Sequence, residues 1–173
     1  MASRWQTIDR QTLKLLKNLD GDNLQPELWD APEKAAPTVA GLRAAFNEGV
    51  TRPISWRKAQ LRALIALCEE NAEVIAAAHK RDLGNRTFFT DLTNITPVVV
   101  EAKDALRDID SWVKPDAKGI PLLIQPGTAE VRKEPYGVVC VIAPWNYPWR
   151  LALLPLVGAI AAGNACLIKP SEV

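Results

Sequence analysis

Residues 138–172 read VVCVIAPWNYPWRLALLPLVGAIAAGNACLIKPSE, and this stretch decides the fold class. Val138–Ala143 is a charge-free run rich in β-branched residues, which predicts a strand covered on both faces in a parallel sheet. A run rich in leucine and alanine follows the loop 144–148, and Gly163-Asn164 predicts the end of that helix. Ala165–Ile168 predicts a second buried strand. The stretch therefore predicts one β-α-β unit, with polar residues beyond the carboxyl ends of both strands, where such sheets bind ligands.

The same stretch admits a second interpretation, a membrane-spanning helix. Leu151–Ile168 is a run of eighteen uncharged, mostly apolar residues, which is close to the shortest length that crosses a bilayer. Pro155, Gly158 and the stop at Gly163-Asn164 interrupt the run, and no cluster of Lys or Arg on one flank sets an orientation. We therefore expect no membrane span in this portion of the chain.

The residues before this stretch predict helices. Four segments carry apolar residues at helical spacing: Val39 to Phe46, Leu61 to Cys68, Asn71 to Gly84 and Pro97 to Val113. Ser55 and Asn71 are predicted N-caps of the second and third helices, and Pro97 suits the first turn of the fourth. The first two thirds of the chain are therefore expected to be mainly helical.

A change of period at Ile120 predicts a β-hairpin. Ile120–Gln125 and Thr128–Glu134 are the expected strands, joined by a Pro126-Gly127 turn, with one face of the hairpin exposed to water. We therefore divide the chain into four parts: an N-terminal arm 1–36, either disordered or carrying a short amphipathic helix, a helical part 37–119, a hairpin 120–136 and the β-α-β unit 137–173.

Composition excludes several classes of protein. A chain of 173 residues that is 48% hydrophobic and 24% charged has the composition of a globular domain, and its formal net charge of +1 does not indicate a nucleic-acid partner. Cys68, Cys140 and Cys166 lie far apart in apolar runs, which argues against disulfides and against a CxxC metal site. Because the N-terminus carries no apolar signal segment, we expect a cytoplasmic location.

Three motifs give the chain a family resemblance. The WNYP loop at 145–148 and the runs GAIAAGNA at 158–165 and IKPSE at 168–172 resemble the cofactor domain of NAD(P)-dependent aldehyde dehydrogenases, particularly the class 3 branch that acts on fatty and aromatic aldehydes. Weaker resemblance extends back to about Pro37. It implies an α/β fold, the N-terminal part of a Rossmann-type cofactor domain. It further implies aldehyde oxidation with NAD or NADP, and a homodimer formed through the hairpin.

The resemblance assigns a catalytic role to Asn146. In that family the Asn of this loop donates an N–H to the negatively charged oxygen that develops from the aldehyde, a form of stabilisation that needs no reorganisation. Trp145, Tyr147 and Pro148 would shape the aldehyde tunnel and one wall of the nicotinamide side. The residues alone leave another interpretation open, in which Asn146 satisfies backbone groups of a tight loop and the aromatic rings only pack.

The same resemblance assigns cofactor contacts at the two strand ends. Lys169 and Glu172 would contact the adenosine ribose, and Ile142, Ala143 and Pro144 would give backbone and apolar contacts. A carboxylate at Glu172 favours NAD, because it repels the 2′-phosphate of NADP. A solvated strand end is the alternative interpretation of the two charged residues.

Other reactive side chains give weaker indications. Cys166 and Cys140 lie in apolar strands, where burial makes a thiol inert. His79 lies near a helix end and is interpreted as contacting terminal carbonyls or water, and no metal site is expected.

Three motifs of the resembling family do not occur in residues 1–173: the Gly-Gln-x-Cys of the nucleophile, the Glu-Leu-Gly-Gly of the base and the glycine-rich phosphate loop. We therefore expect an incomplete N-terminal portion that is inactive alone. The alternative is a non-catalytic cofactor-binding or dimerisation remnant, and the reading frame beyond Val173 distinguishes the two.

Overall fold

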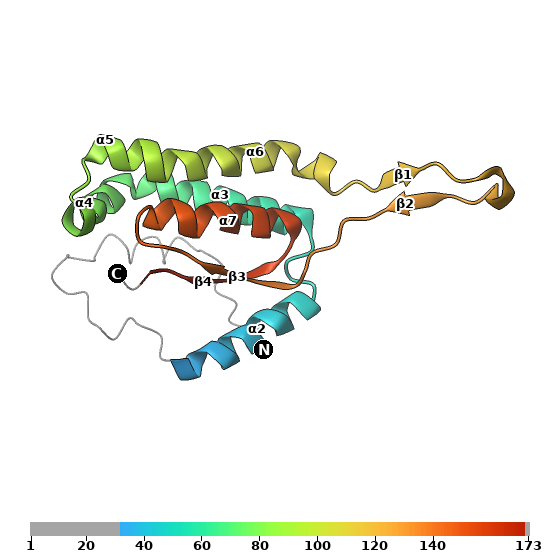
Figure 1. Cartoon of the computed structure of the whole chain (residues 1–173), viewed down its shortest axis with the longest axis horizontal. Helices are drawn as coiled ribbons and strands as arrows, with labels where there is room; N and C mark the ends of the chain where they lie inside the picture. Colours follow the sequence, from blue (N-terminus) through green and yellow to red (C-terminus); the bar gives the residue numbers. More distant parts are fainter. Residues whose placement is uncertain (1–31, 172–173) are drawn as a thin grey trace.

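The predicted β-α-β unit is present in the computed structural model, which describes residues 32–171 (Figure 1). Strand β3 (Val138–Ile142) pairs in parallel with β4 (Ala165–Lys169), and helix α7 (Pro148–Ala162) connects them. Pro148 occupies the first turn of α7, where its missing N–H costs nothing. Gly163 ends the helix with a φ of +89°, the left-handed conformation typical of a helix C-terminus.

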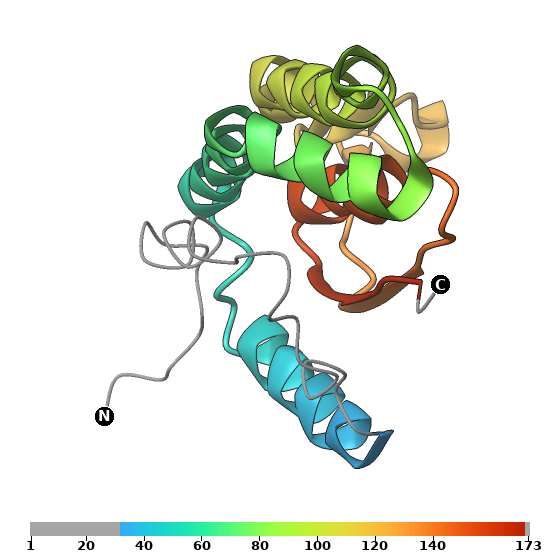
Figure 2. The same cartoon turned by 90° about the vertical axis from the view of Figure 1, so that its left-hand side faces the viewer.

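Helices cover both faces of this strand pair. Helix α7 packs on one face, and α2 (Ala35–Asn47) contacts the other (Figures 1 and 2). Helices α3 (Ile54–Glu70) and α6 (Thr96–Trp112) form a further layer against α7. The main core lies between these three helices and contains Leu61, Leu64, Cys68, Val98, Ala102, Ile109, Val157 and Ile160. The predicted burial of β3 on both faces is only partly observed, because Val141 is buried whereas Cys140 and Ile142 are exposed.

Short helices link α3 to α6. Helix α4 (Ala72–Leu83) ends at Gly84, whose φ is +69°. After it, α5 (Thr87–Thr90) continues through the π-helical turn η3 (Asp91–Ile95) directly into α6. Within residues 32–171 no helix is long and apolar enough to cross a membrane.

The hairpin differs from the prediction. Its strands are β1 (Asp116–Lys118) and β2 (Ala129–Val131), paired antiparallel, and they extend away from the helices (Figure 1). The predicted strand Ile120–Gln125 is wrong, because Leu122–Ile124 forms the 3-10 turn η4 at the tip. Every residue of β1 and β2 is exposed, so the hairpin has no face covered by its own chain.

Two predicted helix caps also need correction. Ser55 is not an N-cap, since α3 begins at Ile54 after the extended residue Pro53. Asn71 stands before α4, but its Nδ2 donates back to the Leu67 carbonyl at 2.9 Å and caps nothing in α4.

The boundary of the predicted N-terminal arm needs correction as well. The 3-10 turn η2 (Pro32–Lys34) and the start of α2 lie inside the arm 1–36. The remainder of that arm is outside the described residues.

A buried polar cluster closes the C-terminal end of α7. The Thr51 hydroxyl donates to the Gly163 carbonyl at 2.7 Å. Arg57 donates through Nε to the Thr51 carbonyl and through Nη1 to the Ala161 carbonyl, both at 3.1 Å. These bonds satisfy carbonyls that a helix end leaves unpaired, and they place a cation at the negative end of the helix. Burial lowers the pKa of the Arg57 guanidinium, and attraction to Glu134 opposes that shift.

Candidate functional site

The carboxyl ends of β3 and β4 lie side by side. Ile142 is directly opposite Lys169 in the parallel register, and the Ala143 N–H donates to the Lys169 carbonyl at 3.0 Å. Ala143 is buried, whereas Ile142 is 76% exposed and Lys169 is exposed. The structure thus brings together three of the residues for which cofactor contacts were predicted, and Glu172 lies outside the described residues. An exposed apolar side chain beside an exposed ammonium suits a ligand with both a flat apolar ring and polar hydroxyls.

The loop between β3 and α7 starts from this edge. Pro144, Trp145 and Asn146 are exposed, and Tyr147 and Pro148 are half-buried. The hydrogen bonds found among residues 32–171 do not involve the Asn146 carboxamide. The alternative in which Asn146 serves the backbone of its own loop therefore has no support in this geometry, and its amide is open to a bound molecule.

Helix α7 adds electrostatic character to this loop. Its 15 residues begin at Pro148, two positions after Asn146, so the positive end of the helix dipole lies beside the loop. A neutral N–H donor next to a helix N-terminus favours an oxygen that carries negative charge. The arrangement can therefore stabilise an oxyanion through the N–H donor and the helix dipole together.

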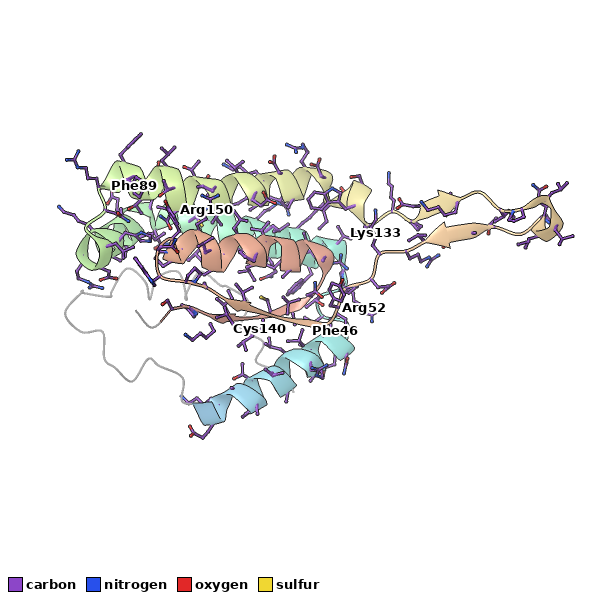
Figure 3. The ribbon with its side chains drawn as sticks, in the orientation of Figure 1. Phe46, Arg52, Phe89, Lys133, Cys140 and Arg150 are labelled. Atoms are coloured by element: carbon purple, nitrogen blue, oxygen red, sulfur yellow. The ribbon has the colours of Figure 1, made fainter. Side chains whose placement is uncertain are left out.

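Two hydrogen bonds that the sequence did not predict hold the first turn of α7, which directly follows this loop. Asn94 Oδ1 accepts a hydrogen bond from the Arg150 N–H, and Trp149 Nε1 donates to Cys68 Sγ, both at 3.4 Å. Figure 3 shows Arg150 at the end of α7 that lies nearest Phe89 of α5. The sequence contains one indication of Asn94. It precedes the buried Val98 by four residues, so it places a polar side chain on the helix face that is otherwise apolar and buried.

The three cysteines differ in environment. Burial raises the pKa of Cys166 to about 11, as the prediction of an inert thiol requires, and burial also raises the pKa of Cys68. Cys140 is exposed on β3, on the side toward α2 (Figure 3), so burial does not explain its predicted inertness. It lies within the strand, two residues before the strand's carboxyl end, and not in the loop.

His79 is buried in α4, with 6% of its surface exposed. Its Nδ1 has no hydrogen-bond partner within the described part of the chain, and burial lowers the pKa of its ring. The predicted contact with terminal carbonyls is therefore not seen for that nitrogen, and the predicted contact with water stays a prediction. Among residues 32–171 no three His, Cys, Asp or Glu side chains gather as a metal site would require.

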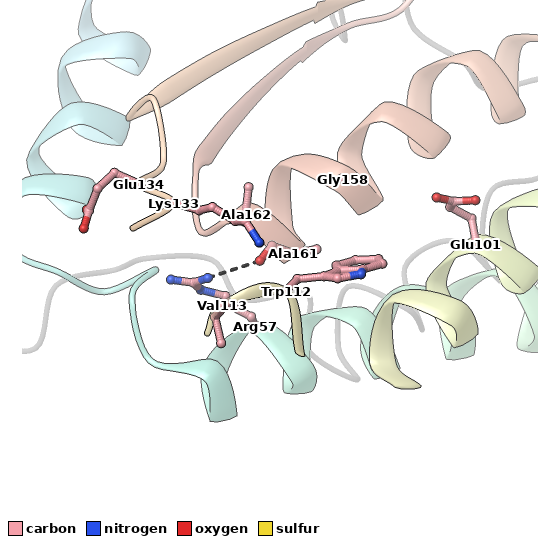
Figure 4. A pocket seen from close by; sticks show the side chains of 9 residues that line it. All are labelled: Arg57, Glu101, Trp112, Val113, Lys133, Glu134, Gly158, Ala161 and Ala162. Carbon is pink, nitrogen blue, oxygen red and sulfur yellow. Dashed lines mark hydrogen bonds between the residues drawn. The ribbon is translucent and has the colours of Figure 1, made fainter. Parts of the chain in front are cut away.

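Two pockets lie away from the strand ends. One, of about 270 Å³, is at the base of the hairpin, lined by Arg57, Trp112, Lys133 and Glu134 among others (Figure 4). The other, of about 420 Å³, lies between Glu69 and Lys103 beside η3. Neither includes a residue of the loop 143–147. These two pockets are therefore separate from the candidate site at the strand ends.

Comparison with known proteins places these features in one family. The sequence profile of the aldehyde dehydrogenase family matches residues 29–173. The chain is 43% identical over 149 residues to aldehyde dehydrogenase family 3 member B2 of Mus musculus, covering 86% of this chain and 31% of that protein. It therefore spans about a third of the length of that curated relative.

Solved structures agree with this match. AldH of Staphylococcus aureus in a substrate-bound state has a TM-score of 0.77 and 38% identity, over 79% of this chain and 30% of that one. PnpE in complex with nicotinamide adenine dinucleotide has a TM-score of 0.66 and 25% identity, over 78% of this chain and 27% of that one.

Proposed function

Since this chain belongs to the aldehyde dehydrogenase family, we propose that it takes part in the oxidation of an aldehyde to its carboxylic acid with NAD⁺ or NADP⁺. One observation supports the proposal above the others: the exposed Asn146 lies in a loop that starts at the shared carboxyl edge of β3 and β4. This is the edge where an α/β sheet binds its ligands.

In the proposed reaction a cysteine thiolate attacks the aldehyde carbonyl, and the carbonyl oxygen becomes negatively charged. Asn146 donates its N–H to that oxygen, and the start of α7 adds a favourable potential. The bound nicotinamide cofactor supplies the hydride acceptor. Trp145 and Tyr147 would line the approach of the aldehyde.

We infer that the nucleophile is not one of the cysteines described above. Cys68 and Cys166 have raised pKa values, so they are protonated thiols at neutral pH, and Cys140 lies on the α2 side of the strand pair. The nucleophile and the general base would then come from sequence beyond these residues, and the present chain would supply the oxyanion donor and part of the cofactor site.

Lys169 gives a test of the cofactor site. Its ammonium at the end of β4 would hydrogen-bond a ribose hydroxyl of NAD⁺ and pair more strongly with the 2′-phosphate of NADP⁺. Replacing Lys169 by Met should raise the Kd for NADP⁺ about tenfold or more, and that for NAD⁺ less. Calorimetric titration of both cofactors measures this. Lys118→Met in the hairpin is the matched control and should change neither Kd. An equal effect of the two substitutions would contradict the assignment of Lys169.

A second candidate function, dimerisation, is favoured by the hairpin tip. Leu122, Leu123 and Ile124 are 82%, 97% and 60% exposed, and a two-stranded ribbon of this kind is marginal unless it packs against something. We propose that the hairpin packs against a second copy of the chain. If the chain is instead a non-catalytic remnant, forming this dimer contact would be its function.

Replacing Leu123 by Asp should therefore weaken the dimer. Because a two-fold contact loses both buried leucines, the dimer dissociation constant should rise about a hundredfold or more. Sedimentation velocity over a concentration series measures it. Leu92→Asp makes the same change at an exposed leucine of η3, outside the hairpin, and is expected to leave the dimer intact. A wild-type chain that is monomeric at every concentration would contradict the proposal.

A further inference from the structure

Asn94 is a fully buried amide bonded to the start of α7. It lies in the π-helical turn η3 and has 0% of its surface exposed. Its Oδ1 accepts the hydrogen bond from the Arg150 N–H at 3.4 Å, and its Nδ2 donates to Thr93 Oγ1 at 3.1 Å. An amide in an apolar interior is costly unless it is hydrogen-bonded. Both the oxygen and the nitrogen of the Asn94 amide are therefore hydrogen-bonded, and the oxygen is bonded to a different helix, α7.

The start of α7 receives no cap from its own N-cap residue. Tyr147 stands at the N-cap position and makes no side-chain cap hydrogen bond. A helix leaves its first N–H groups without intrahelical partners, and Pro148 removes one of these donors. Asn94 accepts from another, so the capping oxygen comes from a different helix about 56 residues earlier in the chain.

A second anchor holds the same helical turn. Trp149 Nε1 donates to the buried Cys68 Sγ of α3 at 3.4 Å. The first turn of α7 is thus attached to η3 through Arg150 and to α3 through Trp149. Asn146 is four residues before Arg150, in the loop that leads directly into this turn.

We propose that Asn94 is a positioning residue for the oxyanion donor, an inference that rests on the proposed function of Asn146. By holding the Arg150 N–H, it fixes the first turn of α7 and therefore the exposed loop 143–147. An apolar side chain at position 94 would fill the same volume in the core without providing this bond.

Hydrogen exchange of the intact chain, measured by mass spectrometry, tests the positioning role directly. Asn94→Leu has nearly the same shape but no acceptor, and it should speed exchange in peptides covering 143–152 about tenfold relative to the core of α3. Asn94→Asp keeps an acceptor beside a helix N-terminus and should restore most of the protection. Asn71→Leu is the matched control, since Asn71 is a buried amide whose Nδ2 donates to the Leu67 carbonyl of α3 and not to α7.

Two outcomes would overturn the inference. One is equal exchange of the 143–152 peptides in Asn94→Leu and Asn94→Asp. The other is a change no larger in Asn94→Leu than in Asn71→Leu.

Kinetics then separate this inference from the proposed function. In the aldehyde-oxidising protein, Asn94→Leu should lower kcat about tenfold with little change in KM, and it should have no further effect when Asn146 is already Ala. If Asn146→Ala leaves kcat unchanged, the proposed function fails, while the exchange result still decides the positioning role.

Discussion

Replacing Asn146 by Ala is expected to lower kcat for aldehyde oxidation by about 10²–10³, with a much smaller change in KM. The amide has little to bind in the neutral aldehyde. The amide binds the carbonyl oxygen strongly only when that oxygen takes up negative charge. Removing the amide therefore raises the free energy of the transition state more than that of the bound aldehyde. Steady-state rates of NAD(P)H formation, measured over a range of aldehyde concentrations, give both parameters.

Two further variants sharpen this expectation. Asn146→Asp replaces a donor by a carboxylate, which repels the developing charge, and should be at least as inactive as Asn146→Ala. Asn85→Ala removes an amide in the loop after α4, outside the loop 143–147, and should keep the wild-type rate. A loss of less than tenfold for Asn146→Ala would contradict the oxyanion role. Because Asn146 is exposed, we expect its variants to unfold at the wild-type urea concentration.

Replacing Gly163 by Ala is expected to lower the free energy of unfolding by about 3–6 kcal/mol. A Cβ at this position would lie 2.5 Å from Cζ and Nη2 of Arg57. The guanidinium cannot simply move, because it is buried and bonded to the carbonyls of Thr51 and Ala161. The positive φ of Gly163 adds strain of about 1–2 kcal/mol for any residue with a Cβ. Urea unfolding followed by circular dichroism measures the change.

A second glycine separates these two causes. Gly84 also ends a helix with positive φ, but a Cβ there would meet nothing within 4 Å. Gly84→Ala should therefore cost only the strain, about 1–2 kcal/mol. Combining Gly163→Ala with Arg57→Met should cost less than the sum of the two single changes, because the flexible Met side chain can avoid the new methyl. Equal losses for Gly163→Ala and Gly84→Ala would contradict the steric account.

The β-α-β unit could be predicted from sequence because its signals are local and strong. Strands of a parallel sheet are mostly apolar, and the observed ends of β3 and β4 lie within one residue of those predicted. The closeness of Ile142 and Lys169 also follows from sequence, since parallel strands end at the same edge. The fold class and the family resemblance are confirmed by the structure and the comparisons. The roles of the individual site residues and the cytoplasmic location stay predictions.

The hairpin and the buried polar residues could not be predicted in the same way. Alternation of apolar residues reports which face of a strand is covered, but β1 and β2 are exposed at every position. The apolar residues of the hairpin therefore predict a strand at Leu122–Ile124, although this segment forms the exposed tip. Arg57 and Asn94 were missed because their partners are backbone groups of α7, about 104 and 56 residues away in sequence. Spacing within one helix contains no information about such partners.

The parallel pairing of β3 and β4 also constrains the order in which the chain can fold. Two parallel strands cannot be joined by a tight turn, so their pairing has to wait until the intervening helix has formed and crossed over the sheet. Helix α7 in turn packs on α3 and α6, and the contact between those two helices closes a longer loop than the strand pair does. Lys58 of α3 and Asp110 of α6 are 52 residues apart, whereas the Gly137–Asn164 hydrogen bond at the start of the strand pair joins residues 27 apart. On simple loop-closure grounds, the β-α-β unit should therefore form before the helical layer closes around it. The loop 143–147 would then form within this local unit, and the contacts that hold the start of α7 to α3 and η3 would follow.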